Sequence, residues 1–385
     1  MSIENSRYDL AIIGGGLAGL ALSIQAAKAG YKTVLFEKEQ YPFHRVCGEY
    51  ISLESWDFLE RLGLPLSQMN LPIIKTLQVT APNGKLFQTK LPLGGFGISR
   101  YTLDNELAKI AKAVGVTVLE NTKVNDVQYN NGVFKISEVG SSPLGGGWEG
   151  AIVCGSFGKR SNLDVKWNRS FIQQKPNKLN NYIGVKYHIK TQHPPDVIAL
   201  HNFENGYCGI SQIEDGKYCL CYLTTAENLK RSNNSIEQLQ QTILYKNPHL
   251  KKIFTHAEFL YEAPVTISQI SFDNKAQLEN HVLMLGDAAG MIKPLCGNGM
   301  SMALHSSKLA FECVDAFLQN NSGRAAMEQR YVQLWNQQFA HRLRTGRMIQ
   351  RFFGKSSITN LFIQSFRTFP FLASPLIQQT HGKPF

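Results

Sequence analysis

The chain has 385 residues and a formal net charge of +11, with 43% apolar and 18% charged residues. This length allows two or three domains with a sizeable core, and the composition is that of a globular protein rather than a disordered or fibrous one. The seven cysteines show no metal-ligand spacing, so we expect a reduced, cytoplasmic protein without a metal.

The first predicted unit is a strand, a helix and a second strand. Residues 8–13 form a continuous apolar run that is typical of a parallel strand with both faces covered. A helix is predicted over residues 17–29 because Gly30 ends it, and residues 33–36 form the next strand. This order favours a parallel α/β sheet.

A glycine motif connects the first strand to the helix. Gly14, Gly16 and Gly19 follow the pattern G-x-G-x-x-G, and Glu37 ends the second strand with Lys38 beside it. Glycines let the backbone approach a pyrophosphate, and a helix N-terminus attracts that anion. We therefore expect a dinucleotide site in which Glu37 accepts hydrogen bonds from ribose hydroxyls.

Three glycine turns follow, and each separates two β-prone runs. They are Asn83-Gly84, Asn131-Gly132 and Asp215-Gly216. An amphipathic helix is predicted between the first two, over residues 101–116. We therefore expect a second, antiparallel sheet whose strands alternate along the chain with a discontinuous nucleotide-binding domain.

Residues 281–300 contain a short apolar strand, Gly286-Asp287 and a helix that begins near Gly299. With the first glycine motif, this segment resembles the FAD-containing aromatic hydroxylase superfamily and its relatives, the geranylgeranyl reductases and flavin-dependent halogenases. The resemblance implies an α/β fold, α+β overall. It divides the chain into a Rossmann-like FAD-binding domain (1–70, 100–165 and 275–325), an antiparallel-sheet substrate domain (71–99 and 166–274) and a C-terminal helical segment (326–385).

The same resemblance implies which residues bind FAD. Asp287 would hold the ribityl chain, and backbone N–H groups at the following helix would stabilise negative charge on the flavin. The expected cofactor-binding residues are Gly14, Gly16, Gly19, Glu37, Lys38, Arg45, Arg100, Val124, Gly286, Asp287, Pro294, Gly297, Asn298, Gly299 and Met300.

Three residues are candidates for the chemistry. Cys47, in the run RVCGE, is either a wall residue beside the flavin or a nucleophile with His44 as its base, and we favour the wall. Glu49 follows it closely. Lys75 lies where a halogenase would place its reactive lysine.

The sequence departs from the aromatic hydroxylases at Phe157-Gly158, where those enzymes carry an acid. This leaves two electron sources open, NAD(P)H or a separate flavin reductase. The four tryptophans do not form the Trp-x-Trp stretch of the halogenases.

We expect a monooxygenase of secondary metabolism that hydroxylates an aromatic or polyketide-type molecule through a flavin hydroperoxide. The alternatives are a geranylgeranyl-reductase-like ene-reductase on a lipophilic substrate and a flavin-dependent halogenase. A non-enzymatic flavoprotein is a fourth class. The expected partners are an apolar or aromatic small molecule, free or carrier-bound, and no nucleic acid, because no recognition motif is present.

The C-terminal segment is strongly basic. Residues 324–385 contain nine Lys or Arg residues and one acid, Glu328. A basic face of this kind is either simply solvated or contacts an anionic partner such as a membrane surface. The phenylalanines of residues 361–377 fit a helical lid over an apolar substrate pocket or a surface-seeking helix, but we expect them to pack on the FAD-binding domain as ordinary core.

Overall fold

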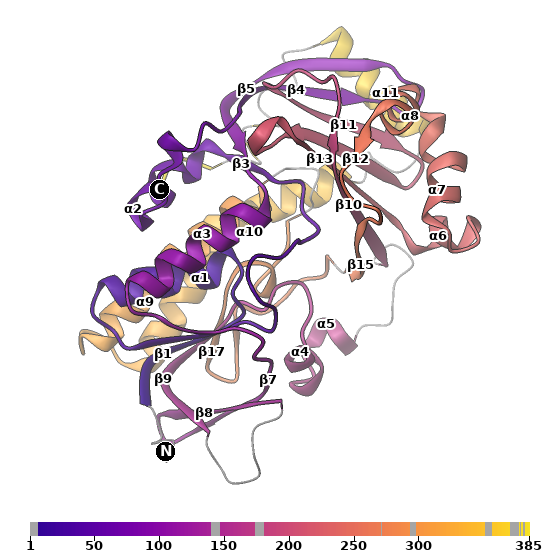
Figure 1. The fold of residues 1–385 in the computed structure, drawn as a ribbon. Helices are drawn as coiled ribbons and strands as arrows, with labels where there is room; N and C mark the ends of the chain where they lie inside the picture. Colours follow the sequence, from indigo (N-terminus) through magenta and orange to yellow (C-terminus); the bar gives the residue numbers. More distant parts are fainter. Residues whose placement is uncertain are drawn as a thin grey trace.

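The structure is a computed structural model and describes residues 7–139, 147–173, 181–270, 272–292, 298–350, 356–369, 377, 379 and 382–385. In the described part of the chain, two large sheets lie at opposite ends of the molecule, and the chain passes between them several times (Figure 1). This arrangement agrees with the α/β fold that the sequence predicts.

The first sheet contains a parallel core. Strand β1 pairs in parallel with β2 on one side and with β9 on the other, and β17 and β6 extend it. The strands are β1 (Arg7–Ile13), β2 (Thr33–Phe36), β6 (Thr117–Leu119), β7 (Val124–Asn130), β8 (Val133–Glu138), β9 (Trp148–Gly155), β16 (Leu278–Glu279) and β17 (Val282–Met284).

Helices cover this sheet because their apolar faces match its buried strands. Helix α1 packs against α3 and α9, and α9 packs against α10. Their bounds are α1 (Leu17–Lys28), α3 (Arg100–Ala113), α9 (Gly299–Leu318) and α10 (Arg324–Gln350); the shorter α2 (Trp56–Leu62), α4 (Asn162–Lys166) and α5 (Ser170–Gln173) lie in the connections.

The second sheet is mainly antiparallel and has the strand order β14-β10-β13-β12-β11-β4-β5-β3, with β15 on β10. Helices α6, α7 and α8 belong to the same half, and α7 and α8 share a core with the sheet through Leu239, Leu250 and Phe254. The bounds are β3 (Tyr50–Ser52), β4 (Ile73–Thr80), β5 (Leu86–Gly97), β10 (Tyr182–Lys190), β11 (Val197–Phe203), β12 (Gly206–Gln212), β13 (Tyr218–Thr225), β14 (Glu258–Phe259), β15 (Val265–Ile270), α6 (Ala226–Arg231), α7 (Ile236–Thr242) and α8 (Pro248–His256).

The three predicted hairpins are confirmed as β4–β5, β7–β8 and β12–β13. The β7–β8 hairpin, however, is joined to β9 and therefore extends the first sheet rather than the second. Strand β3 pairs with β5, so the chain already enters the second sheet at Tyr50.

Helix α11 (Ser356–Thr368) corrects one expectation. Its phenylalanines do not pack on the nucleotide-binding half. Phe362 and Phe366 instead form a cluster with Phe87 of β5 and Ile363. Phe352 and Phe353 lie outside the described residues. In the part of the chain that the structure describes, the helices are too short or too polar to cross a bilayer.

Candidate active site

A cavity of about 1100 Å³ runs between the two halves of the molecule. One end is lined by the β1–α1 turn, residues 36–39 and the end of β9. The other end is lined by β4, β5, β11 and α11. Residues 43–50 form part of the wall along the way.

The glycines of the first motif have different tasks. A Cβ on Gly14 would lie 2.4 Å from the Ser156 carbonyl oxygen, and one on Gly19 would lie 2.2 Å from the Gly14 carbonyl oxygen. These two glycines therefore allow close packing of strand, turn and helix. A Cβ on Gly16 would meet its nearest atom, in Arg100, only at 3.8 Å, so Gly16 leaves open space at the cavity.

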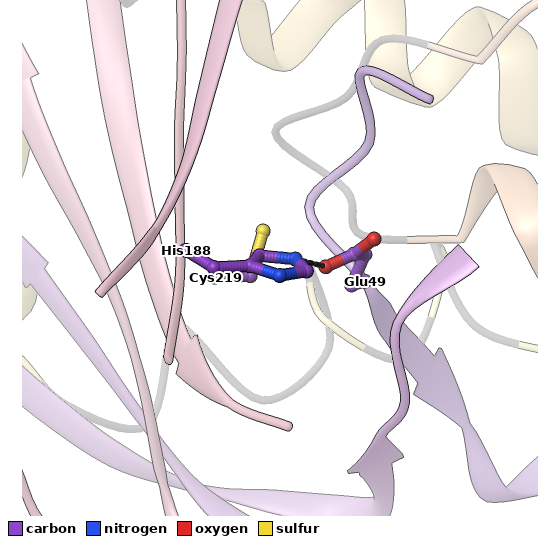
Figure 2. A group of neighbouring side chains, drawn as sticks. All are labelled: Glu49, His188 and Cys219. Carbon is purple, nitrogen blue, oxygen red and sulfur yellow. Dashed lines mark hydrogen bonds and ion pairs between the residues drawn. The ribbon is translucent and has the colours of Figure 1, made fainter. Parts of the chain in front are cut away.

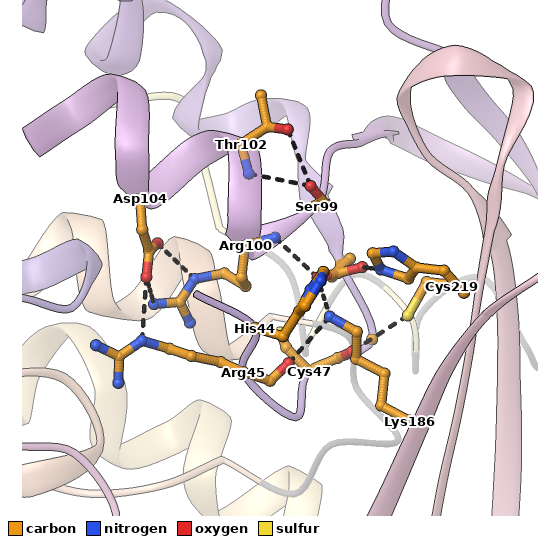
Figure 3. A network of polar contacts seen from close by, with 12 residues as sticks. His44, Arg45, Cys47, Ser99, Arg100, Thr102, Asp104, Lys186 and Cys219 are labelled. Carbon is orange, nitrogen blue, oxygen red and sulfur yellow. Dashed lines mark hydrogen bonds and ion pairs between the residues drawn. The ribbon is translucent and has the colours of Figure 1, made fainter. Parts of the chain in front are cut away.

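Two arginines and two acids surround this end of the cavity. The Arg100 guanidinium donates two hydrogen bonds of 2.7 Å to Asp104, and Arg45 donates to Asp104 at 3.1 Å and to Glu37 at 2.9 Å. Figure 3 shows both guanidinium groups directed toward Asp104. Glu37 also accepts a hydrogen bond from the Gly15 backbone N–H at 2.9 Å, which ties the acid to the glycine turn.

Gly286 and Asp287 approach the cavity from β17. Gly286 has a φ of +54°, and its N–H donates to Ser306 on α9. Two buried cations hold the turn from behind: Lys275 donates to the Asp287 carbonyl oxygen at 2.8 Å, and Arg169 donates to the Ala288 carbonyl oxygen at 3.1 Å. Burial lowers the pKa of Lys275 to about 8. The Asp287 side chain is thus placed by a supported backbone.

Beyond the glycine turn, the cavity wall contains a buried ionic network centred on Glu49. Its carboxylate accepts hydrogen bonds from Lys186 at 2.5 Å, from the Arg100 backbone N–H at 2.8 Å, and pairs with His188 Nε2 at 2.6 Å. Glu49 also has a φ of +55°, a left-handed conformation that costs a non-glycine residue about 1–3 kcal/mol. The network therefore holds a strained residue in place.

Charge explains why Glu49 stays ionised. Burial raises the pKa of the Glu49 carboxyl, but Lys186 and the hydrogen bond with His188 outweigh it and hold that pKa at about 2. For Lys186, burial lowers the pKa while Glu49 raises it, and the net shift is upward. The two groups are a charged pair at neutral pH, out of contact with water.

A line of hydrogen bonds connects this pair to the cavity. Tyr261 Oη lies 2.6 Å from His188 Nδ1 and 3.1 Å from His44 Nδ1, and His44 lines the cavity. If His188 donates from Nε2 to Glu49, its Nδ1 accepts from Tyr261, whose oxygen then accepts from His44. Burial, with help from Lys186 and His188, lowers the pKa of His44 to about 4.

Cys47 lines the cavity in the same segment. Its carbonyl oxygen accepts a hydrogen bond from the Cys219 thiol at 3.2 Å, and the Gly48 carbonyl oxygen accepts one from Ser211 at 3.3 Å. These bonds fasten the segment to β12 and β13. The His44 ring contacts Tyr101, Tyr261 and His188, which fits a place in the network better than the role of base for Cys47.

Comparison with known proteins gives the family context. The family described as an FAD binding domain matches residues 9–45, the first strand–helix–strand unit and Arg45. The chain is 27% identical to the digeranylgeranylglycerophospholipid reductase of Methanococcus vannielii over 87% of this chain and 84% of that protein. These similarities indicate a flavin-dependent oxidoreductase.

Two further similarities also extend over most of the chain. Conditioned medium factor receptor 1 of Dictyostelium discoideum is 25% identical over 98% of this chain and 74% of that protein. The solved structure of the flavin-dependent brominase Bmp2 superimposes with a TM-score of 0.77 at 18% identity, and the match covers 97% of this chain and 93% of that one. This last likeness shows the fold.

The residues of this flavin-dependent oxidoreductase fit FAD, as the open space at Gly16 and the adjacent Arg100 show. The expected FAD-binding residues that line the cavity are Gly14, Gly16, Glu37, Lys38, Arg45, Arg100, Val124, Gly286, Asp287, Gly299 and Met300. Gly19 packs inside α1, and Asn298 is buried where α9 begins. Pro294 and Gly297 lie outside the described residues. The contact of each residue with FAD stays a prediction.

The three catalytic candidates do not lie together in the structure. Cys47 and Glu49 lie in one segment of the wall, whereas the Lys75 side chain is exposed on β4 and does not line the cavity. The lysines that line it, Lys38, Lys123 and Lys159, come from the nucleotide-binding half. The structure therefore does not bring Lys75 together with the other two.

Sequence reasoning missed Lys186, His188 and Tyr261. A signal was present in the strand YIGVKYHIK, where Lys186 and His188 are two residues apart and so share a face of β10. Two ionisable residues on the buried face of an apolar strand require a partner, and Glu49 is that partner.

Glu49, His188 and Cys219 have the geometry of a metal-ligand set, since one ligand atom from each lies within 4.8 Å of the others (Figure 2). Lys186 already places its positive charge against the same carboxylate, and the Cys219 thiol donates to Cys47. Burial also raises the pKa of that thiol well above its ordinary value, which disfavours the thiolate that a metal would need. We therefore assign this group to the ionic network.

Proposed function

We propose that the protein is an FAD-dependent reductase that saturates carbon–carbon double bonds in a lipophilic, isoprenoid-type substrate. The observation that carries this proposal is the composition of the far end of the cavity. Among the described residues, those that line it from β4, β5, β11 and α11 are Leu77, Val79, Phe87, Leu91, Ile198, Leu200, Phe362, Ile363 and Phe366, none of which is charged.

The division of charge along the cavity supports the same substrate class. The charged side chains that line it come from the nucleotide-binding half and from residues 36–50. An apolar chain gains free energy when it leaves water for such a wall, at about 25 cal/mol per Å² of buried area. A charged or highly hydroxylated molecule would lose its hydration there without replacement.

Saturating a double bond adds a hydride to one carbon, which FAD supplies in its reduced form, and a proton to the other. The chain offers a route for that proton from His188, which pairs with the Glu49 carboxylate, through Tyr261 to His44. His44 lines the cavity and would donate the proton to the second carbon, while Tyr261 and His188 each pass one proton forward to replace it. Cys47 and residues 43–50 complete the wall that excludes water.

A relative supports this assignment. The digeranylgeranylglycerophospholipid reductase of Methanococcus vannielii is named for a substrate with isoprenoid chains, and its similarity covers most of both proteins. The halogenase hypothesis is less well supported, because Lys75, its candidate for a reactive lysine, does not line the cavity. The likeness to the brominase is one of fold.

A monooxygenase that acts on an aromatic or polyketide-type molecule is the second candidate. The observation that favours it is the aromatic part of the wall: the Phe87 and Phe366 rings are 5.5 Å apart, and those of Phe362 and Phe366 are 4.5 Å apart. A substrate ring would find edge and face contacts in this cluster.

One assay separates the two. FAD-loaded protein is reduced chemically without oxygen, mixed with a detergent-dispersed digeranylgeranyl lipid, and the product is analysed by mass spectrometry. A reductase adds pairs of hydrogen atoms. A parallel reaction with an aromatic substrate and oxygen detects insertion of an oxygen atom, and added bromide detects halogenation. Oxygen or bromine insertion without any hydrogenation would refute the reductase proposal.

A further inference from the structure

Helix α11 presents apolar side chains on both of its sides. Its inner side chains Phe362, Ile363 and Phe366 line the cavity. On the outside, Leu361 is 70% exposed and Ile358 is 38% exposed. These two residues are three positions apart and therefore lie on one stripe of the helix. A single helix thus separates the apolar end of the cavity from an apolar surface.

Basic residues surround this surface. Lys85, in the turn between β4 and β5, donates to Gln364 of α11, and Arg367 follows near the end of the helix; both are exposed. Helix α8 lies against the same turn, since His249 contacts the Gly84 carbonyl oxygen at 3.0 Å, and it adds the exposed Lys251 and Lys252.

The elements that carry these basic residues, which are the β4–β5 hairpin, α8 and α11, contain no acid. Residues 71–97, 247–257 and 356–385 contain no Asp or Glu in the sequence. Figure 1 shows α8 and α11 together beside β4 and β5, at the end opposite to the first sheet. The combination of exposed aliphatic side chains with uncompensated positive charge is complementary to the surface of an anionic lipid bilayer.

We propose that the outer face of α11 and the β4–β5 turn dock on an anionic phospholipid bilayer, from which the lipophilic substrate enters the apolar end of the cavity. Leu361 and Ile358 would insert among the acyl chains, while Lys85, Lys251, Lys252 and Arg367 would contact the head groups. The docking inference depends only on the exposed aliphatic and basic side chains of this surface. The delivery of substrate, in contrast, rests on the proposed function.

The test uses the full, FAD-loaded chain with vesicles of phosphatidylcholine alone or mixed with phosphatidylglycerol, and measures binding by co-sedimentation. We expect binding to the anionic vesicles that weakens as salt is raised. Leu361→Gln and Lys85→Glu should each weaken it by about fivefold or more. Equal binding of the wild type and both variants would overturn the proposal.

Matched controls come from the opposite end of the molecule. Val139→Gln removes another exposed apolar residue, 59% exposed, and Lys135→Glu reverses another exposed charge on β8. Neither should change vesicle binding. A dimer in lipid-free solution that Leu361→Gln converts to a monomer would show that the surface binds a second copy, which contradicts the membrane assignment.

The same variants distinguish failure of docking from failure of the proposed function. Hydrogenation of detergent-dispersed lipid by the wild type, with no binding to vesicles, would refute docking and leave the reductase intact. Vesicle binding that depends on Leu361, without hydrogenation of any lipid, would support docking and refute the reductase. Loss of turnover by Leu361→Gln only with vesicle-borne substrate would support both.

Discussion

The Glu49 carboxylate lies 2.5 Å from the Lys186 ammonium, and both side chains are fully buried. They come from distant parts of the chain, one from the segment that walls the cavity and the other from β10 of the second sheet. The pair therefore fastens the wall segment of residues 43–50 to the second sheet next to the cavity.

Removing one member of this pair should destabilise the protein strongly. Glu49→Gln leaves the Lys186 charge buried without its partner, which costs about 3–5 kcal/mol. The double variant Glu49→Gln, Lys186→Met should be more stable than Glu49→Gln alone, because the unpaired charge is gone. Urea unfolding of each variant measures these free energies.

The control for this prediction is an exposed pair of the same type. Glu106 and Lys109 lie 2.7 Å apart on the surface of α3. Glu106→Gln should change the free energy of unfolding by less than about 1 kcal/mol. A similar loss in both single variants would show that burial does not set the energy of the Glu49 pair.

Lowering the pH should destabilise the protein over two pH ranges. The His44 pKa is lowered from 6.5 to about 4, so the unfolded chain binds this proton first and the free energy of unfolding falls as pH falls through that range. The Glu49 pKa is lowered from 4.5 to about 2, so its contribution is complete above 4.5 and is lost as pH falls toward 2. Urea unfolding at a series of pH values measures both.

His44→Phe isolates the first pH range. The ring still stacks on Tyr101 but does not titrate, so the slope of the unfolding free energy against pH between about 6.5 and 4 should decrease by the contribution of one proton. His193, His201 and His305, whose pKa values burial also lowers, keep the remaining slope. An unchanged slope in this variant would assign the acid sensitivity to other groups.

Gly14 and Gly16 should differ in what their substitution damages. Gly16→Val places its side chain in the open space of the cavity, so FAD affinity should fall by at least about tenfold while the apoprotein keeps its stability. Gly14→Ala should lower both, because its Cβ meets the Ser156 backbone at 2.4 Å and its φ of +103° suits glycine. FAD fluorescence titration measures the affinity for FAD, and urea unfolding of the apoprotein measures its stability. A Gly14→Ala apoprotein as stable as the wild type would contradict the role assigned to Gly14.

Cys47 should be replaceable if it serves as a wall. Cys47→Ala is expected to keep FAD and to retain turnover within about tenfold of the wild type. Cys221→Ala is the matched comparison, since Cys221 also lines the cavity. Complete loss of activity in Cys47→Ala alone, with FAD still bound, would assign the thiol a chemical role.

Reduction by NADPH or NADH should be slow without substrate. Phe157 lines the cavity and packs on Trp167, at the position where the sequence departs from the aromatic hydroxylases by lacking an acid, so we expect a polar anchor to be missing. Anaerobic stopped-flow absorbance follows flavin bleaching. Reduction at about 10 s⁻¹ in the absence of any substrate would contradict this expectation. Activity that returns only with an added flavin reductase would identify a separate electron donor.

Local patterns explain what the sequence could predict. The strand, glycine turn and helix of residues 8–29 depend on neighbouring residues, so their bounds agree with β1 and α1 within about one residue. The turns at Gly84, Gly132 and Gly216 are local in the same way and were correct. The position of the β7–β8 hairpin in the first sheet depends on its pairing with β9, which turn chemistry does not encode.

The remainder of the site depends on contacts between distant segments. Glu49 meets Lys186 and His188 across more than a hundred residues of chain, and no local propensity selects that pairing. The sequence also could not predict on which half of the molecule α11 packs, because its apolar stripe fits either half. In the structure, α11 packs against Phe87 of the second sheet.

The order of segments around the cofactor end of the cavity has a consequence for biosynthesis. Gly14, Gly16 and Glu37 emerge from the ribosome early, whereas Asp287 and Met300 face the same cavity from far later in the chain. A nascent chain of half the length therefore carries the glycine turn without the opposite wall. If FAD contacts both walls as expected, it binds only after most of the protein has been synthesised, so cofactor supply acts on a nearly complete chain rather than on the first folding unit.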